Sequence, residues 1–295
     1  MSAVYTTFHP GVRPYFRDFM EALDQQTESG FTLYVGLDRC DEQEVHDCAE
    51  RRVDAVFVNN VPGGSMADMR NAGLFKALED GHEAVVLIDA DDVPGPDRVK
   101  NALAGLERHD AVACAMVIVD GELQPVAQKF VPSWQEGMLI RENVFGFSNS
   151  AYRSEILKKC LPVPTECILV DWYLATSVWL AGGRMNCLQS KDLFYRQYGN
   201  NLAQVVPPFS PESVIKAART VLGHYDILLS NPPAGMGPFQ EDIQQAASDV
   251  KTFIACLEAD SKRLAEYAQV LSDSEQPNAW WTGVANPEWE EIWNC

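Results

Sequence analysis

The sequence lacks long apolar runs and has few basic residues. No stretch reaches the roughly 18 consecutive apolar residues that a membrane-spanning helix needs, and the first residues have neither the basic nor the apolar region of a secretion signal. We therefore expect a cytoplasmic protein without a transmembrane segment. Its 23 Lys and Arg residues stand against 42 Asp and Glu residues, for a formal net charge of −19. Because binding to nucleic-acid phosphates needs a basic surface, we expect no nucleic-acid partner.

The sequence also lacks closely spaced cysteine pairs. Its eight Cys residues include no C-x-x-C motif. Cys40 and Cys48 have neither the tight spacing nor the His partners that are typical of a zinc site. We expect reduced thiols, as in cytosolic proteins.

The first 115 residues alternate short apolar runs with helical patterns, which is typical of βαβ units and a mainly parallel sheet with helices on both faces. The expected strands are Val4–Phe8, Phe31–Leu37, Ala55–Val58 and Ala84–Ile88. The expected helices are Pro14–Gln26, Glu42–Arg52 and Met66–Leu78. We predict an α/β, Rossmann-like fold.

The second half of the chain changes character twice. Residues 110–188 give a mixed pattern, with strands expected at Ala111–Val119 and Val126–Val131 and helices at Ser154–Lys159 and Trp172–Ala181. Long helices are expected from Pro211 to Leu229 and then, uninterrupted, over residues 239–272. We therefore predict one domain over residues 1–205 and a helical C-terminal extension over residues 206–295.

The second long helix has a narrow apolar seam, because apolar residues recur at spacings of three and four from Ile243 to Leu271. Two interpretations remain open. The seam either packs on the rest of this chain or forms a homodimer contact through the C-terminal helices.

A cluster of carboxylates follows the most continuously apolar strand. Alternate residues of an extended chain face the same way, so Asp89 and Asp91 can point together. The carboxyl edge of a parallel sheet is where α/β folds bind ligands, and oxygen ligands of this kind suit Mg²⁺ or Mn²⁺. The alternative is a solvated acidic turn, since Val93-Pro94-Gly95-Pro96 follows at once.

Four segments between about residues 3 and 205 resemble the family 2 glycosyltransferases of the GT-A fold. They are Tyr34-Val35-Gly36-Leu37-Asp38, Met69-Arg70-Asn71-Ala72-Gly73-Leu74, Leu87-Ile88-Asp89-Ala90-Asp91-Asp92, and Val170-Asp171-Trp172 together with Leu193–Asn201. The third is similar to the family's D-x-D motif. The resemblance implies an inverting enzyme that moves a sugar from a nucleoside-diphosphate donor, with UDP favoured, to the hydroxyl of a glycan or another acceptor.

The same resemblance assigns site residues. It implies a donor half over about residues 1–115 and an acceptor half over about residues 116–205. It places a Mn²⁺ or Mg²⁺ ion on Asp89 and Asp91 and makes Asp171 the general base. The implied donor-binding residues are Thr6, Phe8, Asp38, Arg70, Asp89 and Arg196, and the implied acceptor-side residues are Asn149 and Trp172.

Two positions depart from the family pattern. Val170 stands where the family has a Glu, and Tyr198 stands where it often has a His. Because Tyr is a poor ligand for these cations, only the aspartates, water and the donor phosphates would hold the metal. Asp171 could instead cap a helix, and Arg70 and Arg196 could instead form ion pairs with protein carboxylates.

Two other functions fit parts of the sequence. Val86–Val93 also matches the strand and D-x-D-x-V of haloacid-dehalogenase-type phosphatases, in which Asp89 would be the nucleophile and Asp91 an acid/base. A non-catalytic nucleotide-sugar binding module would explain the altered residues 170 and 198. The tail residues Trp280, Trp281, Trp289 and Trp293 could pack on the core, stack on sugar rings or contact a membrane surface.

Overall fold

The computed structural model describes residues 1–126, 130–199, 201–274 and 280–295. Its centre is an eight-stranded sheet in the order β3-β2-β1-β4-β7-β6-β8-β5. The strands are β1 (Ser2–Phe8), β2 (Phe31–Leu37), β3 (Val56–Asn59), β4 (Ala84–Leu87), β5 (Val93–Pro94), β6 (Ala111–Val119), β7 (Ser150–Arg153) and β8 (Met185–Arg196).

The sheet is mixed but mainly parallel, as predicted. Strand β1 pairs in parallel with β2 and β4, β2 pairs in parallel with β3, and β6 pairs in parallel with β8. Strand β7 joins these two groups because it runs antiparallel to both β4 and β6, and β5 runs antiparallel to β8 at the edge. The strand expected at Val126–Val131 falls partly on residues 127–129, which lie outside the described residues, and beside it only isolated bridges occur, Met116 to Phe130 and Val119 to Pro125.

The helices surround this sheet and extend beyond it. They are α1 (Phe16–Asp24), α2 (Glu42–Cys48), α3 (Met66–Glu79), α4 (Arg98–Leu106), α5 (Ser154–Cys160), α6 (Val170–Leu180), α7 (Pro211–Ser230), α8 (Gln240–Ala259), α9 (Ser261–Asp273) and α10 (Glu290–Trp293). Short 3-10 turns lie at Pro10–Val12, Met138–Ile140, Gly237–Phe239 and Pro287–Trp289.

Strand β1 shows why helices cover both faces. All seven of its residues are buried, and successive side chains of a strand point to opposite faces. The Tyr5 hydroxyl reaches α3, where it donates a 3.0 Å hydrogen bond to the carbonyl of Met69. The Phe8 ring lies against Phe16 of α1 on the other face, with 4.8 Å between ring centroids. The sheet therefore lies between two helical layers.

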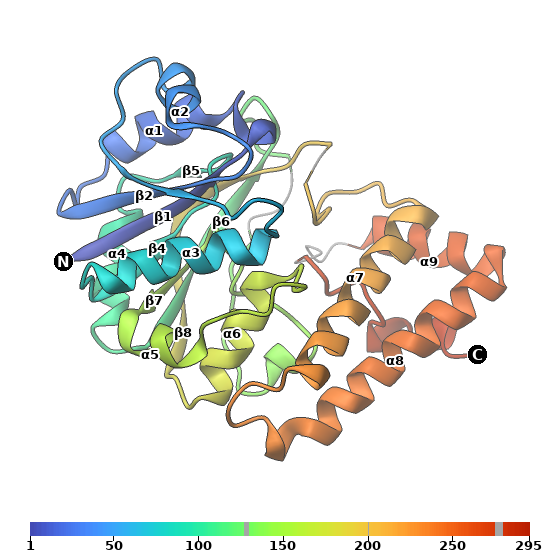
Figure 1. Ribbon diagram of the computed structural model, residues 1–295. Coiled ribbons are helices and arrows are strands. Elements are labelled where there is room, and N and C mark those ends of the chain that lie inside the picture. The colour runs from blue at the N-terminus through green and yellow to red at the C-terminus, as the bar shows by residue number, and fades with distance from the viewer. Residues whose placement is uncertain (127–129, 200, 275–279) are drawn as a thin grey trace.

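The C-terminal helices pack on one another beside the sheet (Figure 1). The helix expected over residues 239–272 is wrong as a single element, because α8 ends at Ala259 and α9 begins at Ser261. Asp260 has the extended angles φ −136° and ψ 100°, and its carboxylate accepts hydrogen bonds from the backbone nitrogens of Lys262 and Arg263. The spacing of apolar residues continues across this cap, so the sequence pattern did not reveal the break.

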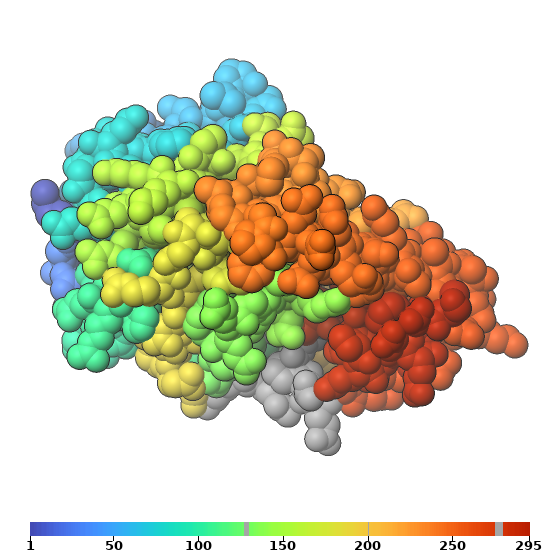
Figure 2. Space-filling view, turned by 90° about the horizontal axis from the view of Figure 1, so that it is seen from below, coloured from blue at the N-terminus to red at the C-terminus, as the bar shows by residue number. Residues whose placement is uncertain are grey.

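Most of the seam packs within the chain. Ile243, Ala247 and Val250 of α8 and Ala268 and Leu271 of α9 are buried. The tail residues Trp280, Trp281 and Trp293 are buried as well, and the end of the chain lies against the C-terminal helices (Figure 2). A homodimer contact stays a prediction. Among the described residues, no helix is both long enough and apolar enough to cross a membrane.

Candidate active site

Polar residues follow the carboxyl ends of three neighbouring strands, β2, β1 and β4. Asp38 follows β2 directly, and its backbone nitrogen donates a 2.9 Å hydrogen bond to the carbonyl of Phe8 at the end of β1. His9 follows β1 directly, and Asp89 follows β4 after Ile88. Because these strands are parallel, the three side chains are brought to one edge of the sheet.

Asp89 is paired with Arg70 of α3. The Nη2 atom of Arg70 lies 3.3 Å from Oδ1 of Asp89, and both side chains are largely covered. The guanidinium also lies 3.7 Å above the centre of the Phe147 ring, an arrangement that fixes its plane. Burial, with help from the charges of Asp91 and Asp171, raises the pKa of Asp89 to about 7 although Arg70 opposes this shift.

Asp91 is held by Tyr198. The phenolic hydroxyl donates a 2.6 Å hydrogen bond to Oδ2 of Asp91. The Tyr198 ring lies against the Tyr15 ring, with 4.7 Å between centroids. Burial and the neighbouring Asp91 charge raise the pKa of Tyr198, so the phenol keeps its proton and acts as a donor.

Asp92 points into the protein. It is 1% exposed, and its Oδ1 accepts a 2.8 Å hydrogen bond from the backbone nitrogen of Arg196. Its Oδ2 is buried without a hydrogen-bond partner among the described residues. Burial raises its pKa well above the usual range, and the charges of Asp91 and Asp89 add to the effect.

Arg196 is enclosed by protein acceptors. Its Nη2 atom forms a 2.8 Å ion pair with Asp18, its Nε atom donates to the carbonyl of Asp91 at 2.8 Å, and its Nη1 atom donates to the carbonyl of Gly121. The guanidinium also lies 4.4 Å from the centre of the Tyr15 ring. The predicted contact of Arg196 with a donor would require this network to open, and it stays a prediction.

Asp171 lies in the first turn of α6. Its Oδ2 accepts a 3.0 Å hydrogen bond from Nδ2 of Asn143. Burial raises its pKa, although Arg70 and Asn143 pull it down. Asp171 also interacts electrostatically with Asp89. The structure therefore brings the predicted base to the same site as the predicted metal ligands.

Four other predicted residues are buried, and the hydrogen bonds of two of them go to backbone carbonyls. Thr6 and Phe8 are fully buried in β1. The amide of Asn149 donates to the carbonyls of Cys114 and Val144, and the indole nitrogen of Trp172 donates to the carbonyl of Leu139. Their contacts with a donor or an acceptor stay predictions.

His9, Asn143 and Ser148 also belong to this site, and of these His9 and Asn143 were not predicted from the sequence. Burial lowers the pKa of His9, which also interacts electrostatically with Asp91 and Asp38. The Ser148 hydroxyl accepts a 3.1 Å hydrogen bond from the backbone nitrogen of Asp89. His9 could have been predicted from the sequence, because it directly follows strand β1 as Asp38 directly follows strand β2. Asn143 lies in irregular chain, where no sequence pattern marks it.

The oxygen-rich cluster fits a hard divalent cation with incomplete protein ligation. Asp89 and Asp91 both keep partly exposed side chains, and carboxylate oxygens are the ligands that Mg²⁺ and Mn²⁺ prefer. Within the described ranges, no group of three or more His, Cys, Asp or Glu residues could hold a metal ion. The other ligands would be water and phosphate oxygens, as is common for Mg²⁺.

Comparison with known proteins identifies the fold. No protein-family model matches the sequence, and no curated protein matches it. Among solved structures, S. aureus TarS in complex with UDP-GlcNAc has a TM-score of 0.56 and 17% sequence identity, and the match covers 92% of this chain and 88% of that one. The mannosyltransferase PcManGT from Pyrobaculum calidifontis, in complex with GDP-Man and Mn²⁺, has a TM-score of 0.54 and 16% identity, with coverages of 98% and 87%. The chain has the GT-A fold. The predicted fold class is thereby confirmed, and the C-terminal helices are present as expected.

Proposed function

We propose that this GT-A protein is an inverting glycosyltransferase. It moves a hexosyl group from a nucleoside-diphosphate donor, with UDP favoured, to an acceptor hydroxyl. The observation that carries the proposal is the meeting of Asp89, Asp91 and Asp171 beside Arg70 at the carboxyl edge of the sheet. The bound UDP-GlcNAc of TarS and the bound GDP-Man and Mn²⁺ of PcManGT support a donor of this class.

The donor residues divide by position. Asp38 would bind the nucleotide base, and Thr6 and Phe8 of the neighbouring strand β1 would lie beneath this base. Asp38 suits this role because it follows β2, which is separated from β7 and the acceptor half by β1 and β4. Asp89 and Asp91 would hold Mn²⁺ or Mg²⁺, with Arg70 nearest the diphosphate and Arg196 reaching it once its network of protein contacts opens. Once bound, the cation would act as a Lewis acid that neutralises charge on the leaving diphosphate.

Asp171 would act as the general base. The acceptor oxygen attacks the anomeric carbon, the bond from this carbon to the diphosphate oxygen breaks, and the hydroxyl proton moves to a carboxylate oxygen of Asp171. Attack from the face opposite the leaving group inverts the anomeric configuration. The raised pKa of Asp171 suits this role, because a base is more effective when its pKa approaches the working pH. Asn143 would hold the carboxylate in place, and Asn149 and Trp172 would support the acceptor side.

The fold does not favour the phosphatase alternative, because Asp89 follows the fourth strand of a GT-A sheet rather than the opening strand of its domain. The non-catalytic alternative is separated by experiment. We would screen UDP-, GDP-, CDP- and dTDP-sugars with Mn²⁺ and a mixture of glycan acceptors, and measure release of the nucleoside diphosphate and the sugar product.

The base assignment has its own control in the same screen. Asp171→Asn should lower transfer by about 10²–10⁴-fold, the usual contribution of a general base. Asp242→Asn changes an exposed aspartate in the first turn of α8 and should leave transfer unchanged. If Asp171→Asn keeps more than about a tenth of wild-type transfer, Asp171 is not the base. If a nucleotide binds but no sugar moves, the protein is a binding module.

A further inference from the structure

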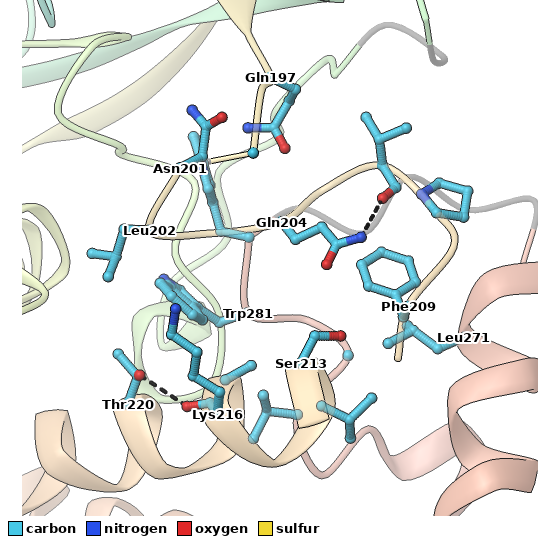
Figure 3. Close-up of a pocket in the computed structure, with 18 of the residues that line it drawn as sticks. Gln197, Asn201, Leu202, Gln204, Phe209, Ser213, Lys216, Thr220, Leu271 and Trp281 are labelled. Carbon is cyan, nitrogen blue, oxygen red and sulfur yellow. Dashed lines mark hydrogen bonds between the residues drawn. The ribbon is translucent and has the colours of Figure 1, made fainter. Parts of the chain in front are cut away.

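A pocket of about 510 Å³ lies between the loop that follows β8, the first half of α7 and the tail segment that begins at Trp280. Figure 3 shows side chains from all three elements around it. Its volume lies within the roughly 300–1,000 Å³ of small-molecule binding sites. The cation and base residues do not line it, so this pocket is separate from the cluster described above.

Two side chains nevertheless connect the pocket to that cluster. Tyr198 lines the pocket and donates its hydroxyl to Asp91. Trp280 lines the pocket from the other side, and its ring covers Gly146 so closely that a Cβ there would overlap it. Gly146 belongs to the same segment as Asn143, the partner of Asp171. An occupant of the pocket would therefore lie one side chain, that of Tyr198, away from the predicted metal ligand Asp91. It would also lie against Trp280, which packs on the segment that positions Asp171 through Asn143.

The place of the β8 strand in the sheet favours the acceptor, rather than the donor, as the molecule that binds in this pocket. The predicted donor residues follow β2, β1 and β4, whereas the loop from Gln197 onward follows β8, three strands further along the sheet than β4. A sugar nucleotide bound near β2 would thus reach the carboxylate cluster from the β2 side of the sheet. The pocket lies on the β8 side of the same cluster.

The loop that forms one wall is held in shape by its own amide side chains. Oε1 of Gln197 accepts a 3.0 Å hydrogen bond from the backbone nitrogen of Val205, Nδ2 of Asn201 donates to the carbonyl of Arg196 at 2.9 Å, and Nε2 of Gln204 donates to the carbonyl of Pro208 at 2.7 Å. A wall that is ordered in advance reduces the entropy cost of binding. These amides therefore hold the wall of the pocket in shape.

The remaining groups alternate between apolar and polar. Leu202 is 54% exposed and Val126 is 42% exposed, and the buried Trp281 and the side chain of Lys216 also line the pocket (Figure 3). Lys216 is exposed and forms no ion pair with any described residue. The Thr220 hydroxyl donates to the carbonyl of Lys216, which leaves its oxygen free to accept. Apolar patches beside single donors and acceptors match a sugar chain, which has C–H faces and hydroxyl edges.

We propose that this pocket binds the acceptor and that the acceptor is a carbohydrate chain. This inference rests on the proposed glycosyl transfer. The carbohydrate would lie between the β8 loop and α7, and one of its hydroxyl groups would extend past Tyr198 and Trp280 toward Asp171. The helical extension is then part of the substrate site, since α7 and the tail segment supply two of the three walls.

The test fills the pocket without touching the cluster. Ala217→Trp adds an indole from α7 into the pocket, and Leu202→Asp places a charge on its exposed apolar edge. Asp226→Trp puts the same indole at an exposed position of α7 outside the pocket and is the matched control. An array of immobilised oligosaccharides, supplied with Mn²⁺ and sugar nucleotides, reports transfer. Calorimetry with the nucleoside diphosphate and Mn²⁺ reports donor binding.

We expect wild type and Asp226→Trp to label carbohydrate spots, and Ala217→Trp and Leu202→Asp to label them at least tenfold more slowly with the nucleotide affinity of wild type. The inference alone is overturned if both pocket variants label at the wild-type rate. It is also overturned alone if wild type hydrolyses the donor yet labels no carbohydrate. If wild type neither binds a nucleoside diphosphate nor hydrolyses a donor, the proposed function fails and the inference fails with it.

Discussion

The hydroxyl of Tyr198 lies 2.6 Å from Oδ2 of Asp91 and donates a hydrogen bond to it. By the sequence resemblance, Tyr198 stands where the family often has a His, and in this structure its hydroxyl binds the carboxylate of Asp91. Hydrogen bonds to ionised groups are short and strong. The bond therefore fixes the orientation of Asp91 and occupies one of its two oxygens.

Removing this bond should make Asp91 a better cation ligand. In Tyr198→Phe, both oxygens of Asp91 become available to the cation. Cation binding then no longer competes with a hydrogen bond whose net free energy is about 0.5–1.5 kcal/mol. We expect Mn²⁺ to bind roughly 2- to 10-fold more tightly in the absence of nucleotide. Paramagnetic resonance of free Mn²⁺ measures this directly. Weaker binding in Tyr198→Phe would instead mean that the phenol orients Asp91 for the metal.

The acid limb of the transfer reaction should report on Asp171. A general base works only when deprotonated, and burial raises the pKa of Asp171 above the usual range for an aspartate. Transfer should therefore fall as the pH falls through this raised pKa. Asn143 lowers the pKa through its hydrogen bond, so Asn143→Ala should move the limb to higher pH. The profile of kcat/KM against pH is the measurement, and an unmoved limb in Asn143→Ala would contradict the pairing.

His224 should make the folded protein sensitive to acid. It stacks on Trp172 with 4.4 Å between ring centroids, and burial lowers its pKa from 6.5 to about 3. Between these values the unfolded chain binds a proton that the folded chain does not. Stability should thus fall as the pH drops from 6.5 toward 3, by up to about 1.4 kcal/mol per pH unit.

Substitution tests the His224 effect. His224→Phe keeps an aromatic ring against Trp172 and removes the titrating group, so its unfolding free energy should depend less on pH over this window than that of wild type. Urea unfolding at several pH values gives both curves. Equal slopes for the two proteins would show that His224 is not the source.

Gly73 allows α3 to approach β1. A Cβ at Gly73 would overlap the ring of Tyr5, whose hydroxyl bonds to Met69 next to Arg70. Overpacking of this kind costs about 1–3 kcal/mol, so Gly73→Ala should lower the free energy of unfolding. Gly223→Ala in α7 is the matched control, because no atom lies within 4 Å of its added Cβ. It should stabilise the protein by about 0.5–1 kcal/mol, and a similar loss in both variants would contradict the packing argument.

Much of the sheet could be predicted because its strands are buried on both faces and therefore read as continuous apolar runs. The expected ranges near β1, β2 and β4 match those observed, and from them follows the carboxyl edge that gathers Asp38 and Asp89. Contacts between distant segments could not be predicted. The partners Tyr198 and Asp91 are 107 residues apart, and Asn143 and Asp171 are 28 apart, so no local pattern joins them.

The structure of the C-terminal half was harder to predict from the sequence, for a different physical reason. Apolar periodicity continues through Asp260, so it could not show that a side-chain cap divides the helix there. Four tryptophans close together favour packing on the core, but stacking on sugar rings and membrane contact fit the same pattern. Trp280 is buried against Phe130 and Tyr195, with ring centroids 5.2 Å and 6.1 Å away, and only the folded chain reveals these partners.

The central claim is a metal-assisted nucleotide site at Asp38, Asp89 and Asp91, and a thermal-shift panel tests it most directly. UDP, GDP, CDP and dTDP would each be added with and without Mn²⁺. A ligand that binds only the folded state stabilises it by about 2.7 kcal/mol at a hundredfold excess over its dissociation constant. We expect a Mn²⁺-dependent rise in Tm with one nucleotide, UDP being favoured. No rise with any of the four would contradict the donor site.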